Sequence, residues 1–217
     1  MIVDNVQAIT QRISKACDKC GRRRCDVSLV CVTKEAAVAR MEEALEAGVT
    51  IFGENRVQDA LAKHKVISDR ASWHLIGHLQ TNKAKDAVRI FDLIHSVDSL
   101  RLAQEIDKQA GKIGKVQDIL IQVNTSGEAS KFGIGPEEAA GLIRDAGLLK
   151  NISIKGLMTI APEVEDPETV RPYFTALREL RDSIDRSWQL SMGMSNDFEV
   201  AVEEGATLVR VGRAVFT

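Results

Sequence analysis

SLVCVTKEAAVARMEEALEAGVTIFGEN, residues 28–55, contains one strand–helix–strand unit. Its two ends, SLVCVT (28–33) and TIFGEN (50–55), are short runs rich in apolar residues, which is typical of buried strands. Between them, residues 37–47 repeat apolar side chains at helical spacing, and Gly48 follows as a left-handed cap. Two strands joined through a helix are predicted to lie parallel in one sheet.

The same alternation continues along the rest of the chain. Further strands are predicted at residues 72–77, 93–98, 118–124, 152–159, 189–194 and 207–212. Helices are predicted at residues 56–67, 82–90, 99–113, 136–149, 167–186 and 196–204. Pro136 and Pro167 mark the starts of two helices, and Gly114 and Gly205 follow the ends of two others.

Strand–helix units without a change of composition favour a closed (β/α)8 TIM barrel, so we expect residues 1–217 to form a single α/β domain. The G-x-G-x-x-G fingerprint of a dinucleotide fold does not follow the first predicted strand. The segment after Gly212 is too short for a full eighth helix. A helix predicted over about residues 4–16, before the first strand, is expected to cover that gap.

The composition narrows the range of partners and compartments. The formal net charge is −2 and 44% of the residues are hydrophobic, so neither nucleic acid nor an anionic membrane is expected to bind. No apolar stretch is long enough for a membrane span, and MIVDNVQAIT lacks the features of a signal peptide. We therefore expect a cytoplasmic protein.

The four cysteines, Cys17, Cys20, Cys25 and Cys31, all lie near the start of the chain. The spacing of CDKC is compatible with zinc or redox chemistry. A zinc site needs a second pair of ligands, and none follows at the usual separation. Reduced thiols with a structural role are therefore favoured over a metal site.

Polar residues follow the predicted strands, where the working residues of a barrel lie. Lys34, directly after the first strand, is most simply a solvated lysine. At a barrel mouth, however, a partly desolvated lysine becomes an amine that can form a Schiff base. Residues 191–195 and 210–213 come from the last two strands and contain the tight turns that can bind a phosphate group.

Several motifs resemble the pyridoxal phosphate homeostasis protein family: VCVTKEA, FGENRVQ, WHLIGHLQTNK, IHSVDS, VNTSGEASKFG, GLMTI and LSMGMSNDFEVAVEEGATLVRVGRAVF. The resemblance runs from about residue 28 to the end. It implies the type III pyridoxal-enzyme fold, similar to the barrel of alanine racemase. It also implies binding of pyridoxal 5'-phosphate as a Schiff base for intracellular homeostasis of this cofactor, with little or no catalysis. Apo pyridoxal enzymes are the implied recipients, and we expect a monomer or weak dimer.

The resemblance also assigns roles to individual residues. It makes Lys34 the Schiff-base lysine and places Asn55 close to the cofactor. Ser195 and the backbone of Gly212 and Arg213 are implied to hold the phosphate group. Many relatives carry Thr where this chain has Arg213, so a hydroxyl contact is lost, while the guanidinium can itself pair with phosphate.

The remaining implied site residues surround the pyridine ring. Arg210 is implied to face the ring nitrogen, and His74, Met158 and Ser191 to line the same mouth. An arginine does not give up its proton, so it disfavours a protonated ring and weakens the cofactor as an electron sink. The alternative role for Arg210 is a salt-bridged barrel residue.

The alternatives to a cofactor carrier are a stand-alone amino-acid racemase and a cofactor-free aldolase. A stand-alone amino-acid racemase needs a second base, and the resemblance implies a tyrosine from a following domain or a partner subunit. The sole tyrosine here, Tyr173, lies on the helix predicted at 167–186. A cofactor-free aldolase would place its lysine on a later strand, where Lys155 lies in mid-strand. Glu54 is interpreted as an acid, a base or an ion-pair partner of Arg56.

Overall fold

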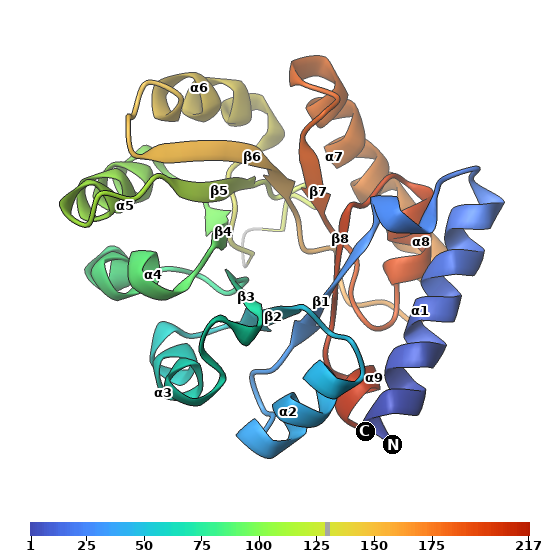
Figure 1. Ribbon diagram of the computed structural model, residues 1–217. Coiled ribbons are helices and arrows are strands. Elements are labelled where there is room, and N and C mark those ends of the chain that lie inside the picture. The colour runs from blue at the N-terminus through green and yellow to red at the C-terminus, as the bar shows by residue number, and fades with distance from the viewer. Residues whose placement is uncertain (129–130) are drawn as a thin grey trace.

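Eight parallel strands close into a barrel in the computed structural model, which describes residues 1–128 and 131–217 (Figure 1). The strands are β1 Ser28–Val32, β2 Ile51–Glu54, β3 Ser72–Leu75, β4 Leu93–Val97, β5 Gln117–Gln122, β6 Ile152–Met158, β7 Gln189–Ser191 and β8 Leu208–Val211. They follow one another around the barrel, and β8 closes it against β1, with Cys31 opposite Val211. The predicted (β/α)8 TIM barrel is confirmed. Two residues of the VNTSGEASKFG motif, 129 and 130, lie outside the described residues.

The helices lie around the strands (Figure 1). They are α1 Ile2–Lys19, α2 Val38–Glu46, α3 Val57–Ile67, α4 Ala84–Ile90, α5 Leu100–Lys112, α6 Pro136–Ala146, α7 Arg171–Ile184, α8 Phe198–Glu203 and α9 Arg213–Phe216. The prediction of one helix over 167–186 is wrong at its start, where Pro167–Val170 is a 3-10 turn. Pro172, at the beginning of α7, explains the break, because proline is tolerated only in the first turn of a helix.

The predicted helix over 196–204 is also shorter, because the Asp197 carboxylate accepts the Met194 N–H at 2.5 Å and keeps residues 194–197 in a turn. Gly48, Gly114 and Gly205 follow α2, α5 and α8 with φ of +89°, +67° and +100°. These three helix ends agree with the left-handed caps predicted from the sequence.

The first helix covers the side of the barrel where the last helix is a single turn. α1 extends over Ile2–Lys19, which is longer than the predicted 4–16, and it packs against α2, α8 and α9. Asn5 Nδ2 donates to the Val215 carbonyl at 3.0 Å, which brings the two ends of the chain together (Figure 1). Arg12 makes two bonds to Glu199 of α8, of 3.1 and 2.8 Å. α1 therefore occupies the place left by the short α9.

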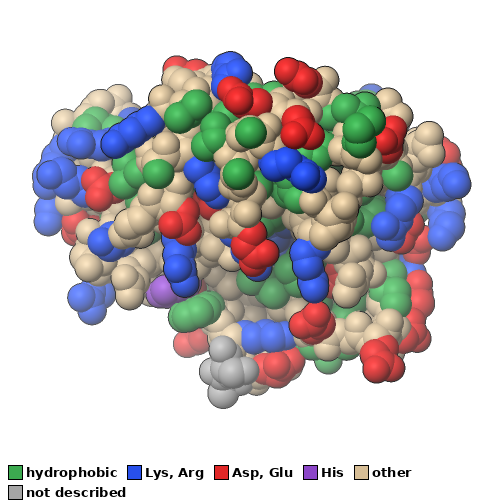
Figure 2. All heavy atoms as spheres, turned by 90° about the horizontal axis from the view of Figure 1, so that it is seen from below, with side chains coloured by type: hydrophobic (Ala, Val, Ile, Leu, Met, Phe, Trp, Pro, Cys, Tyr) green, Lys and Arg blue, Asp and Glu red, His purple; other side chains and the backbone are tan. Residues whose placement is uncertain are grey.

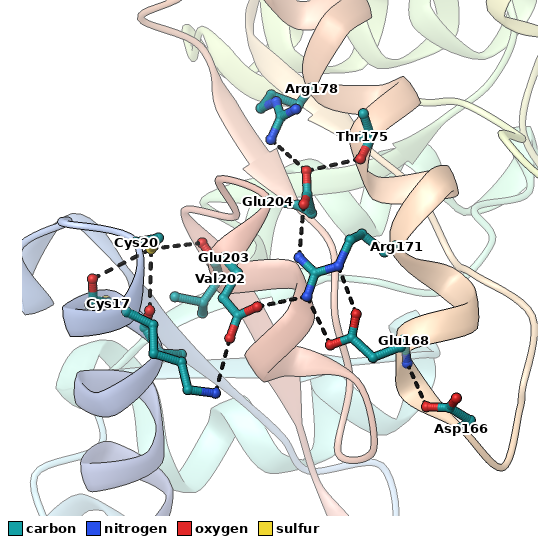
Figure 3. A network of polar contacts seen from close by, with 12 residues as sticks. Cys17, Cys20, Asp166, Glu168, Arg171, Thr175, Arg178, Val202, Glu203 and Glu204 are labelled. Carbon is teal, nitrogen blue, oxygen red and sulfur yellow. Dashed lines mark hydrogen bonds and ion pairs between the residues drawn. The ribbon is translucent and has the colours of Figure 1, made fainter.

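A network of ion pairs connects the helices around β8 (Figure 3). Arg171 at the start of α7 lies 2.7 Å from Glu203 and 2.8 Å from Glu204, at the end of α8. Lys19 of α1 contacts Glu203 at 3.2 Å, and Arg178 of α7 also contacts Glu204. The network fixes α8, which follows directly on the loop after β7.

The surface carries charges of both signs, and two of the four cysteines are exposed on it. Acidic and basic side chains are interspersed over the face shown in Figure 2. Cys17 and Cys31 are buried as free thiols, whereas Cys20 and Cys25 are exposed. Within residues 1–128 and 131–217, no helix has the length and apolar character needed to cross a membrane.

Candidate cofactor site at the barrel mouth

A cavity of about 320 Å³ opens where β1, β2 and β8 end and where the loop after β7 begins. Its lining includes these predicted site residues: Lys34, Asn55, Ser195, Arg210, Gly212 and Arg213. A larger cavity of about 580 Å³ lies at the opposite end of the strands, against α1, and none of the predicted site residues lines it. Working residues of such barrels lie at the carboxyl ends of the strands, so the smaller cavity is the candidate site.

Lys34 reaches the cavity from the end of β1, and the residue before it is held firmly. The Lys34 side chain is 49% exposed, and its Nζ lies 3.7 Å from a Glu35 carboxylate oxygen. The Thr33 hydroxyl donates to Glu54 Oε1 at 2.6 Å, and Lys63 Nζ donates to the Thr33 carbonyl at 2.5 Å. Thr33 is therefore held through its hydroxyl group and its carbonyl group, which fixes the backbone that presents Lys34.

Of the roles left open for Glu54, the ion pair with Arg56 is not formed, and Glu54 pairs with Lys63 instead. Glu54 is fully buried, and its Oε1 accepts from Lys63 Nζ of α3 at 2.7 Å. Arg56, two residues after Glu54, lies outside the strand and is exposed. The pair of Glu54 and Lys63 joins β2 to α3 beneath Lys34.

Asn55 follows β2 and lines the cavity because Gly77 lets its backbone approach β3. A Cβ added at Gly77 would lie 2.8 Å from the Asn55 Cα and would overlap the Asn55 carbonyl oxygen. The Gly77 carbonyl also accepts from the Ser96 hydroxyl at 2.7 Å, which fixes the glycine from the other side. Only a residue without a side chain fits between these two contacts.

Gly77→Ala is expected to lower the free energy of unfolding by about 1–3 kcal/mol, because the new methyl group displaces the Asn55 backbone. Urea unfolding measures this change. The control is Gly141→Ala in α6, where an added Cβ meets nothing within 4 Å and alanine is expected to stabilise the helix by about 0.5–1 kcal/mol. Equal effects of the two substitutions would contradict the role of Gly77.

Two loops on the far side of the cavity present free backbone N–H groups. Gly193 has φ of +89°, and its carbonyl accepts from the Arg210 N–H at 2.9 Å, which ties the loop after β7 to β8. Within the described residues, no acceptor is found for the backbone N–H groups of these loop residues: Ser195, Asn196, Gly212 and Arg213. Unpaired N–H groups from two adjacent turns form a favourable environment for an anion.

The charged side chains near these loops differ in how freely they can move toward a ligand. Arg213 is exposed, with its guanidinium 3.7 Å from a Glu163 carboxylate oxygen, so it can turn toward a bound anion. Asp197 is buried, and this burial raises the pKa of its carboxyl group. Its bond to the Met194 N–H engages the carboxylate within its own loop.

Arg210 lies at the floor of the cavity and is almost fully buried. Its Nη1 donates to Ser191 Oγ at 2.6 Å, and its Nη2 donates to the Thr159 carbonyl at 2.8 Å. Burial lowers the pKa of Arg210 to about 10, so the guanidinium is still protonated at neutral pH. Arg210 can therefore donate hydrogen bonds into the cavity but does not act as a base there.

The other three predicted residues do not line this cavity; they lie beneath it, inside the barrel. Met158 is buried among apolar side chains that include Ile76, which does line the cavity. Ser191 contacts Arg210, and His74 is connected to Ser191 through His95. Burial lowers the pKa of His74 to about 4 and that of His95 well below its usual range, so both rings are neutral at neutral pH.

Sequence reasoning missed His95, Asp197 and Lys63. The alternation of strand side chains could have indicated His95, because Leu93 faces the barrel interior and His95 follows two residues later. For Lys63, no local signal distinguishes it from Lys65, the other lysine of α3. In the part of the chain that is described, no cluster of His, Cys, Asp and Glu has the arrangement of a metal site.

The fold and the site first indicate the broad class of protein to which the chain belongs. The profile of the alanine racemase N-terminal domain matches residues 5–217. An alanine racemase of Clostridium difficile superposes with a TM-score of 0.73 at 16% identity, over 98% of this chain and 56% of the racemase. At this identity the likeness shows the fold alone.

Closer relatives define the family. The chain is 45% identical to the pyridoxal phosphate homeostasis protein of Aquifex aeolicus, over 98% of this chain and 96% of the relative. The corresponding Escherichia coli protein is 35% identical over 99% of this chain and 95% of its own length. PipY of Synechococcus elongatus, in a structure with PLP bound, superposes over the full length of both chains with a TM-score of 0.85 and 35% identity. The chain belongs to the pyridoxal phosphate homeostasis protein family, as its motifs predicted.

Proposed function

We propose that the chain binds pyridoxal 5'-phosphate in the mouth cavity, through a Schiff base on Lys34, and takes part in homeostasis of this cofactor with little or no turnover. The observation that carries the proposal is the composition of one cavity, which combines the Lys34 amine, two loops with free N–H groups and the buried Arg210. The names of the relatives and the PLP-bound PipY structure support the same ligand.

The residues present fit this ligand. A cavity of about 320 Å³ lies within the usual range for small-molecule sites. Lys34 Nζ would attack the aldehyde carbon, so that a carbon–nitrogen double bond forms and water leaves. Ser195, Arg213 and the free N–H groups would hold the phosphate group, while Arg210 would donate to the ring nitrogen. The bound cofactor supplies a reactive aldehyde and an electron-accepting ring.

Slow turnover is proposed because the site lacks the groups that carbanion chemistry needs. A permanently protonated Arg210 disfavours a protonated pyridine ring, which weakens the electron sink. No Tyr, His or Cys is found among the described residues that line the cavity, and Tyr173 packs against the core from α7. A racemase with two bases is therefore not favoured. We place the protein in the cytoplasm as a monomer or weak dimer, with apo pyridoxal enzymes as recipients.

The test combines a binding measurement with a turnover assay. The purified protein is titrated with pyridoxal 5'-phosphate, and we expect a visible absorbance band that borohydride reduction converts into a stable adduct. The same sample is assayed for interconversion of L- and D-alanine and for activation of an apo pyridoxal enzyme. Binding with activation of the apoenzyme but without racemisation supports the proposal. Racemisation at rates typical of enzymes would contradict it, and so would the absence of binding.

A further inference from the structure

A chain of buried hydrogen bonds runs from Arg210 into the barrel interior, away from the mouth cavity. The first link is between Arg210 Nη1 and Ser191 Oγ, which lie 2.6 Å apart. Ser191 Oγ lies 2.9 Å from His95 Nδ1, and His95 Nε2 lies 3.0 Å from His74 Nδ1. Ser191 and His95 are fully buried. The direction in which each hydrogen bond is donated therefore depends on the bonded groups themselves and not on solvent.

The number of donor hydrogens on the three groups determines the direction of each hydrogen bond. A guanidinium can only donate, so Ser191 Oγ accepts from Arg210. The one other partner of the Ser191 hydroxyl among the described residues is His95 Nδ1. If Nδ1 carried a proton, the Ser191 hydrogen would be buried without an acceptor, which is costly. The single proton of the neutral His95 ring therefore belongs on Nε2, which donates to His74 Nδ1.

The electrostatics of the site favour the same arrangement. Burial lowers the pKa of His95, and the neighbouring His74 and the Arg210 charge act in the same direction. With the proton on Nε2, the lone pair of Nδ1 points toward Ser191 and the guanidinium, and the N–H points away from them. A dipole oriented this way is attracted by the cation, whereas the opposite tautomer would be repelled.

We infer that His95 and His74 are positioning residues for Arg210, acting through a chain in which every hydrogen bond is donated away from the guanidinium. The chain holds Nη1, and the Thr159 carbonyl holds Nη2, so Arg210 has its orientation before any ligand enters the cavity. The consequence for the cofactor rests on the proposed function. The tautomer inferred for His95 does not rest on that function, because it follows from the hydrogen bonds of the buried chain.

The first arm of the test is ¹⁵N NMR of histidine-labelled protein without cofactor. We expect His95 to show a protonated Nε2 and an unprotonated Nδ1 at neutral pH. The His95→Leu spectrum identifies the His95 signals among those of the four histidines of the chain. A protonated Nδ1, or a doubly protonated ring, would overturn the inference whether or not the cofactor binds.

The second arm compares His95→Leu with His95→Asn in titrations with pyridoxal 5'-phosphate. Leucine removes the acceptor for the Ser191 hydroxyl and is expected to weaken binding by about tenfold or more, whereas an Asn oxygen near the Nδ1 position is expected to recover most of the affinity. Thermal unfolding of both variants separates a loss of stability from a loss of binding.

The possible results of the two arms can be told apart. Wild-type affinity in a folded His95→Leu protein would overturn the positioning role, and so would equal losses in two folded variants. If His95→Leu does not fold, the wild-type protein is labelled together with His64→Asn, His74→Asn and His78→Asn, so that the His95 signals are those that remain after the other three histidines are assigned. If the wild-type protein does not bind pyridoxal 5'-phosphate, the proposed function fails, while the tautomer of His95 still decides the direction of the chain.

Discussion

Lys34→Ala is expected to abolish the borohydride-stable adduct between the protein and pyridoxal 5'-phosphate. The substitution removes the amine that lines the mouth cavity but leaves the free N–H groups and Arg210 in place. Weak non-covalent binding should therefore persist, without the visible band of the covalent form. Because Lys34 is half exposed and its one ion pair among the described residues is a long one of 3.7 Å, stability should change by only about 0.5 kcal/mol or less.

The matched control for this substitution is Lys155→Ala. Lys155 lies in the middle of β6, its side chain is 44% exposed, and it pairs with Asp118 at 3.5 Å outside the mouth cavity. We expect this variant to form the same adduct as the wild-type protein. The measurement is mass spectrometry of peptides after reduction. An adduct that survives Lys34→Ala, or one that disappears with Lys155→Ala, would refute the assignment of Lys34.

The parts of the molecule that follow from local pattern could be predicted from the sequence. Each strand was recognisable as a short apolar run, and Gly48, Gly114 and Gly205 marked helix ends that the structure confirms. The carboxyl ends of parallel strands meet at one face of a barrel, so strand order alone was enough to bring Lys34 and Gly212 to one cavity.

Contacts between distant segments could not be predicted in the same way. His95 and Ser191 are separated by 96 residues, and their bond depends on how far each strand is staggered around the barrel. His74, Met158 and Ser191 belong to strands that end at the mouth, yet their side chains point into the interior below the cavity. Whether a side chain lines the cavity or the space beneath it depends on how far each strand is staggered along the barrel axis, which the sequence does not encode locally.

Lys63→Met is expected to lower the free energy of unfolding by about 3–5 kcal/mol, because it leaves the Glu54 carboxylate buried without a cation. Lys63 Nζ is also a donor to the Thr33 carbonyl, so the backbone before Lys34 loses one of the hydrogen bonds that hold it. Glu54 Oε2 finds no hydrogen-bond partner among the described residues, which means that Lys63 and Thr33, both bound to Oε1, are its main compensation. Urea unfolding at neutral pH measures the loss.

A second substitution tests whether the buried charge is the cause. In Lys63→Met combined with Glu54→Gln, no unpaired charge remains, so we expect the double variant to be more stable than Lys63→Met alone. Lys65→Met, on an exposed position of the same helix, is the control and should change stability by only about 0.5 kcal/mol. If Lys63→Met behaves like Lys65→Met, the pair does not hold the backbone beneath Lys34. If the double variant is as unstable as Lys63→Met, the loss comes from packing rather than from the charge of Glu54.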